Sequence, residues 1–187
     1  MTSVASLYNS LPSVEEAATK FINRAHIFLK LASLLAEYEH KFGVCLVHAH
    51  CKLEEGEIMV SSGNVTQPER DVEGYPECWL ASGEPYEFTK KPIASPPPEL
   101  FSQFREIVDG IDVLGLYAVS APPSSGILRE HTDGRKNITT IVASADPQDI
   151  ETAWLPGVVN PILRSCSRAC VYDPIRGGKH HHLHSRG

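Results

Sequence analysis

A stretch of helical periodicity near the N-terminus places the strongest limit on the fold. Ser13 and Glu16 have the spacing of a capping box, in which each side chain satisfies a backbone N–H at the start of a helix. Apolar residues then recur every three or four positions, at Ala17, Phe21, Ala25, Phe28, Ala32 and Leu35. The pattern predicts one long amphipathic helix over residues 14–39, with its apolar face packed on the rest of the domain.

The length and composition are those of one folded domain. The chain has 187 residues, of which 42% are hydrophobic and 21% charged, and a domain usually takes about 100–200 residues. We expect residues 1–176 to form a single domain and residues 177–187 to form a flexible, histidine-rich tail. The net charge of -6 lacks the basic footprint of a nucleic-acid-binding protein.

Strand signals recur through the middle of the chain. Residues 43–52 carry apolar and β-branched residues bounded by charge, and a turn at residues 54–56 leads into residues 57–60, which predicts two antiparallel neighbours. Residues 111–119 read as a central strand, and residues 127–131 and 136–143 read as a hairpin around Asp133 and Gly134.

The other segments complete the expected fold. Three prolines precede a helix at residues 99–108, residues 61–98 read as an ordered loop pinned by aromatic residues, and residues 146–154 read as a short helix. Together these elements predict an α+β domain. It has an antiparallel sheet of about five strands, with the long N-terminal helix and one or two shorter helices on one face.

Two histidines carry the clearest chemical signal. His48 and His50 are two residues apart in a predicted strand, so both imidazoles lie on one face. Three roles remain open. The two histidines would act as hydrogen-bonded core residues, as ligands of one divalent ion such as zinc or iron, or as a metal-free acid and base.

Other residues are candidates to complete a site around this pair. Glu57 on the neighbouring predicted strand is the candidate third metal ligand. Glu130 or His131 near the hairpin tip is a candidate base, and Arg135 is a candidate anchor for a substrate carboxylate. The alternative is that this tip is an ordinary solvated turn.

A second group of possible ligands closes the chain. Cys166, Cys170, His180 and His182 form an alternative site for structural zinc, although their spacing is not that of a zinc finger. The competing interpretation is a mobile tail that captures metal adventitiously. Cys45 and Cys51 alternate with the histidines and are expected to be buried thiols. No dinucleotide fingerprint or phosphate-binding glycine loop is present, so we expect no nucleotide cofactor.

The order of several short motifs resembles a group of small, mostly uncharacterised proteins encoded in filamentous fungi. These motifs are Phe42-Gly43-Val44, His48-Ala49-His50, Pro76-Glu77-Cys78-Trp79, Gly115-Leu116 and residues 134–139. The resemblance implies a fungal lineage, a cytoplasmic setting and a specialised metabolite as substrate. It carries over no activity and no catalytic residue.

These observations lead to two functional hypotheses. In the first, the chain is a small soluble enzyme that acts on a small organic molecule by metal-assisted or acid/base chemistry, with His48 and His50 at its centre. In the second, it is a non-enzymatic binding or accessory protein, stabilised by zinc at the C-terminal cluster. In that case the aromatic loop at residues 75–88 would form a partner surface. Neither hypothesis includes nucleic acid or a membrane as a partner.

Overall fold

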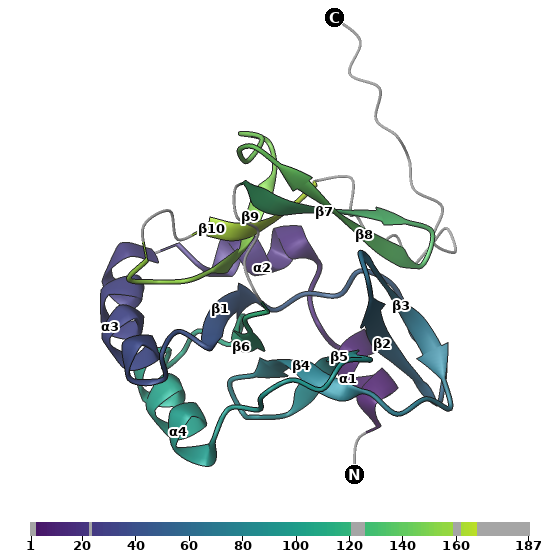
Figure 1. The fold of residues 1–187 in the computed structure, drawn as a ribbon, viewed down its shortest axis with the longest axis horizontal. Helices are drawn as coiled ribbons and strands as arrows, with labels where there is room; N and C mark the ends of the chain where they lie inside the picture. The colour runs from purple at the N-terminus through teal and green to yellow at the C-terminus, as the bar shows by residue number, and fades with distance from the viewer. Residues whose placement is uncertain (1–2, 23, 121–125, 159–161, 168–187) are drawn as a thin grey trace, which may run out of the picture.

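Ten strands pair edge to edge around a complete circle and form a closed barrel (Figure 1). The structure is a computed structural model that describes residues 3–22, 24–120, 126–158 and 162–167. The strands are β1 Phe42–Leu46, β2 Glu57–Ser62, β3 Val65–Arg70, β4 Tyr75–Leu80, β5 Pro85–Thr89, β6 Leu114–Ala118, β7 Ile127–Asp133, β8 Lys136–Val142, β9 Ile150–Trp154 and β10 Ile162–Cys166. The helices are α1 Val4–Asn9, α2 Val14–Lys20, α3 Arg24–Glu37 and α4 Pro98–Ile107.

The strand order around the barrel is β1-β6-β4-β5-β2-β3-β8-β7-β10-β9. The circle closes where β9 pairs with β1, with Trp154 opposite Val44 and Ala153 opposite Cys45. Two of the pairings, β2 with β5 and β7 with β10, are parallel, and the others are antiparallel. Closure pairs the strand edges that an open sheet would leave available for aggregation.

The predicted α+β fold with a five-stranded antiparallel sheet is therefore wrong. Much of the difference lies in residues 61–98, which we expected to be a loop but which supply β3, β4 and β5. Pro68, Pro76 and Pro85 lie inside these strands, and proline argues against a strand because it has no N–H to donate to the ladder. Here the pairing of β4 with β5 accommodates Pro76 next to a β-bulge.

The prediction of one long N-terminal helix is also wrong, although the start of the helix was predicted correctly. Ser13 and Glu16 form the expected capping box at the start of α2, but α2 ends at Lys20. Phe21 then leaves helical geometry, with φ -113° and ψ 81°. Its buried ring packs against Trp154, with 5.7 Å between ring centroids. Tertiary packing at Phe21 thus interrupts a periodic pattern that continues into α3.

Two further predictions about the elements need correction. Residues 146–154 contain no helix, because Ile150–Trp154 form β9 beside β1. The strands β1 and β2 are not neighbours, since β1 pairs with β6 and β9 while β2 pairs with β3 and β5. The predictions of α4, of a strand within residues 111–119, and of the β7–β8 hairpin around Asp133 are confirmed.

Strand alternation divides the apolar residues into two clusters. Val44 and Leu46 of β1 belong to an outer cluster with residues of α3 and α4, which lie side by side on one flank of the barrel (Figure 1). Cys45 belongs to an inner cluster with Cys78 and Tyr117. The inner cluster supplies several residues that surround the candidate site, and Cys166 of the outer cluster also lies there. None of the helices in the described part of the chain is long and apolar enough to cross a membrane.

Candidate metal centre

His48 and His50 lie just after the end of β1, not on a strand as predicted, and both are buried. Contacts from the N-terminal segment hold this stretch of backbone in place. The Ala49 N–H donates to the Pro12 carbonyl at 2.9 Å, and the His50 N–H donates to the Tyr8 hydroxyl at 3.0 Å. The two imidazole centroids are 4.6 Å apart. The rings are therefore neighbours, as predicted, although the supporting backbone is irregular.

Cys166 completes a group of three possible metal ligands. One ligand atom from each of His48, His50 and Cys166 lies within 4.8 Å of the others, and all three residues are buried. Zinc bonds to nitrogen and sulfur in a tetrahedral site place such atoms about 3.6 Å apart. A bound ion would therefore draw the three side chains together by a modest rotation. The group fits one ion.

The surroundings of His48 present a free lone pair. Its Nδ1 lies 2.6 Å from the Leu46 carbonyl oxygen, and because a carbonyl only accepts, Nδ1 carries the proton. Its Nε2 is buried and has no hydrogen-bond partner in the described structure. Burial and the neighbouring His50 lower the pKa of His48 to about 4, so the ring is neutral at pH 7. A neutral imidazole oriented by a backbone carbonyl is typical of a metal ligand.

His50 is surrounded by polar side chains from the β7–β8 hairpin. Its Nδ1 lies 3.5 Å from the Thr132 hydroxyl, and its Nε2 lies 3.3 Å from Asn137 Nδ2. The Asn137 amide also hydrogen-bonds to Glu130, which helps to keep that carboxyl ionised. An ion that takes the lone pair on His50 Nε2 would leave Asn137 with this second acceptor.

Glu130 provides a negative charge next to the group. One carboxylate oxygen accepts a hydrogen bond from Arg164 at 2.9 Å, and the other lies 3.9 Å from His50 Nε2. Burial alone would raise the pKa of Glu130, but Arg164 and the two histidines outweigh it, and the net pKa lies below the usual value. The structure thus places Glu130 at the site, where the sequence predicted a base.

A small cavity, called here the lumen cavity, lies inside the barrel beside the two imidazoles. It measures about 20 Å³, and its lining includes His48, His50, Glu87, Tyr117, Glu130 and Thr152. Burial raises the pKa of Glu87 to about 7, which allows this carboxyl to hold or release a proton near neutrality. A space of this size accommodates one or two water molecules.

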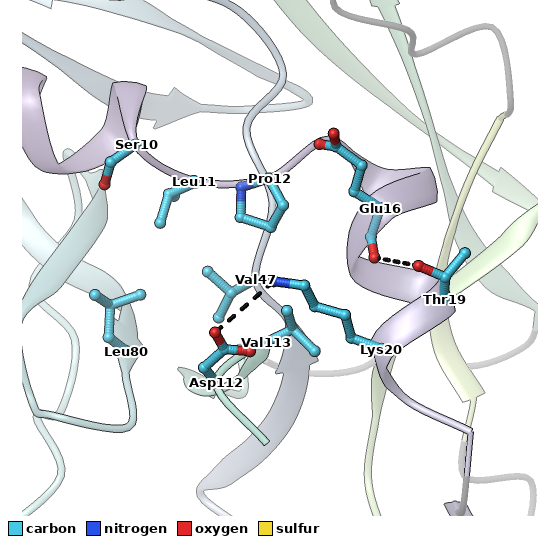
Figure 2. A pocket seen from close by; sticks show the side chains of 10 residues that line it. All are labelled: Ser10, Leu11, Pro12, Glu16, Thr19, Lys20, Val47, Leu80, Asp112 and Val113. Atoms are coloured by element: carbon cyan, nitrogen blue, oxygen red, sulfur yellow. Dashed lines mark hydrogen bonds and ion pairs between the residues drawn. The ribbon is translucent and has the colours of Figure 1, made fainter. Parts of the chain in front are cut away.

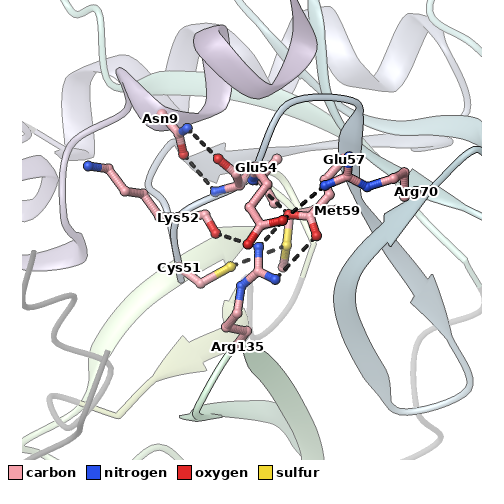
Figure 3. A network of polar contacts seen from close by, with 9 residues as sticks. Asn9, Cys51, Lys52, Glu54, Glu57, Met59, Arg70 and Arg135 are labelled. Carbon is pink, nitrogen blue, oxygen red and sulfur yellow. Dashed lines mark hydrogen bonds and ion pairs between the residues drawn. The ribbon is translucent and has the colours of Figure 1, made fainter. Parts of the chain in front are cut away.

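The other predicted site residues lie elsewhere. Glu57 forms an ion pair with Arg135, and Arg135 also donates to the Lys52 carbonyl at 2.8 Å (Figure 3). This polar network holds the segment that follows the histidines and is separate from the three possible ligands. His131 alternates with the buried Glu130 on β7 and points to the opposite face. Glu57 is thus not the third ligand.

The ion pair between Glu57 and Arg135 should make the free energy of unfolding depend on pH in the acidic range. The hydrogen bond from Arg135 lowers the pKa of Glu57 below its ordinary value of 4.5. The resulting stabilisation is present above pH 4.5 and is lost as the pH falls through the lowered, folded-state pKa. At pH 7, Glu57→Gln is expected to reduce the free energy of unfolding by about 1 kcal/mol, a modest value because Arg135 is half exposed.

Urea denaturation at several pH values measures this effect. The difference between wild type and Glu57→Gln should shrink below pH ~4. Glu55→Gln, a change at a nearby exposed acid, serves as the control and should leave stability unchanged throughout. A difference between wild type and Glu57→Gln that stays constant with pH would contradict the assignment.

A larger groove lies outside the barrel wall (Figure 2). It measures about 440 Å³ and combines apolar residues such as Leu11 and Leu80 with an ion pair between Lys20 and Asp112 at 3.8 Å. Val47 lines this groove, and the next residue, His48, lines the lumen cavity. Consecutive residues of one segment therefore line the two spaces.

Sequence reasoning missed several members of the site. It placed Cys166 with Cys170, His180 and His182, and these last three lie outside the described residues. It did not single out Arg164, Glu87 or Tyr117, because no local pattern marks them. The parallel pairing of β10 with β7, with Cys166 opposite Glu130, brings Cys166 to the histidines. Comparisons with protein-family models, curated proteins and solved structures found no match to this chain.

Proposed function

We propose that this chain is a metal-binding protein that holds one divalent transition-metal ion between His48, His50 and Cys166. The unpartnered Nε2 of His48 carries the proposal, because a buried acceptor without a partner is costly unless something binds it. Two imidazoles and a thiolate favour a borderline-soft ion, so zinc is preferred to iron, and magnesium and calcium are poor candidates.

We further propose that the ion serves chemistry on a small molecule. Three protein ligands leave one coordination position open, which is the pattern of catalytic zinc sites, whereas structural sites are closed by four. Glu130 and Glu87 line the adjoining cavity and are the candidate acid and base. Because the cavity measures about 20 Å³, only a molecule of a few non-hydrogen atoms fits beside the ion.

The second candidate is a structural ion in a non-enzymatic protein. It is favoured by the position of Cys166 on β10, since an ion would tie this strand to the segment after β1 and reinforce barrel closure. Removal of the ion by a chelator separates the two functions. An ion needed only for structure would unfold the barrel when it leaves, whereas an ion used for chemistry leaves a folded apoprotein.

Elemental analysis of protein purified without metal affinity tests the proposal. The C-terminal histidines His180, His181, His182 and His184 are first replaced with alanine in the full chain, so that the tail contributes no metal. We expect one equivalent of metal, lost in His48→Ala and Cys166→Ala but kept in His131→Ala and Cys51→Ala. The controls remove a histidine and a buried thiol outside the group.

Loading with Co²⁺ reports on the same ligands directly. A thiolate-to-cobalt absorption band should appear in the wild type and vanish in Cys166→Ala. Far-ultraviolet circular dichroism establishes that each variant is folded. Metal that persists in both ligand variants, or no uptake by the folded wild type, would contradict the proposal.

A further inference from the structure

Three residues that line the lumen cavity each carry a buried polar atom with no hydrogen-bond partner in the described structure. These atoms are His48 Nε2, Tyr117 Oη and Thr152 Oγ1. They come from three separate elements, namely the segment after β1, strand β6 and strand β9. Buried polar groups are rarely left unpaired, so three around one small space indicate a polar molecule held between them.

The size of the cavity limits that molecule. About 20 Å³ is enough for one or two waters but not for a ring or a branched organic group. The two imidazoles line the cavity, whereas Cys166 is not part of its lining. The cavity therefore adjoins the group of three possible ligands at His48 and His50.

Glycine at position 43 makes room for the phenol of Tyr117. A Cβ at this position would lie 2.5 Å from Tyr117 Cζ and 2.6 Å from its oxygen, which is closer than real Cβ contacts allow. The ring therefore lies against bare backbone, and its buried oxygen belongs to a residue of the inner cluster. Burial raises the pKa of Tyr117, so the phenol keeps its proton and can donate a hydrogen bond.

We propose that the open coordination position takes only a ligand of one to three non-hydrogen atoms, held also by the Tyr117 and Thr152 hydroxyls. This inference rests on the proposed function and narrows its ligand to water-sized molecules and small linear anions. The hydroxyls donate to the ligand, and the cavity wall excludes larger molecules. Any substrate that coordinates the ion must belong to this class.

Ligand titration of the full chain loaded with Co²⁺ tests the inference. Azide is the small linear probe, and imidazole is the larger probe with a similar preference for the metal. We expect azide to change the visible spectrum in a saturable way and imidazole to leave it unchanged at the same concentration. Tyr117→Phe and Thr152→Val keep the shape of each side chain and should each weaken azide binding about tenfold. Tyr38→Phe removes an exposed hydroxyl and should change nothing.

The possible outcomes separate this inference from the proposed function. No cobalt band from Cys166 in the folded wild type would overturn both. A normal band with imidazole binding as readily as azide would overturn only the size limit. A normal band with unchanged azide affinity in both hydroxyl variants would overturn the hydrogen-bonding role, and circular dichroism of each variant excludes unfolding as the cause of any loss.

Discussion

Gly115→Ala is expected to destabilise the barrel by about 3 kcal/mol or more. Gly115 lies in the middle strand of three, opposite Cys45 on β1 and Leu80 on β4. A Cβ there would overlap the Trp79 carbonyl oxygen and lie 2.9 Å from Val47 Cγ2. Because the first obstacle is backbone, no side-chain rotation relieves the overlap, and the strands must separate.

Urea denaturation of the metal-free protein measures the loss. Gly43→Ala is the matched comparison, because its obstacle is the end of the Tyr117 side chain, with Cζ at 2.5 Å. Combining Gly43→Ala with Tyr117→Leu should cost less than the sum of the two changes, since the ring is removed. A Gly115→Ala variant with a stability close to that of wild type would mean that β6 is not held this tightly between β1 and β4.

Glu130→Gln is expected to reduce the free energy of unfolding by about 3–5 kcal/mol, as happens when one partner of a buried ion pair is removed. Glu130 Oε1 and Arg164 Nη1 are 2.9 Å apart, and the side chains of Glu130 and Arg164 are only 4% and 27% exposed. The substitution keeps the shape of the side chain but leaves the guanidinium without its counter-charge. The remaining positive charge then faces the two histidines in a poorly solvated space.

A double variant tests this explanation. Glu130→Gln with Arg164→Met removes both charges and should recover part of the lost stability, since an apolar replacement of a buried pair is often tolerated. Glu54→Gln makes the same change in the exposed pair of Glu54 with Arg70 and should have little effect. Equal losses at the buried and exposed pairs would contradict the role given to Glu130. Denaturation of metal-free protein is again the measurement.

The structure brings together the central residues of the site proposed from the sequence, but only some of the surrounding ones. The spacing of His48 and His50 predicted neighbouring imidazoles, and their centroids are 4.6 Å apart. Glu130, another candidate from the sequence, lies next to His50. Glu57 was wrong as a ligand because it rested on the pairing of two strands that are not neighbours. The incorrect prediction of strand pairing therefore led to an incorrect choice of ligand.

Local patterns in the sequence by themselves determined the capping box of α2, the helix α4, a strand within residues 111–119 and the β7–β8 hairpin. Each depends on residues a few positions apart, so its signal is contained in a short window. Only the tertiary structure decided the closure of the barrel, the break at Phe21 and the meeting of Cys166 with the histidines. Those features depend on strand pairing and packing between distant segments, which periodicity does not encode.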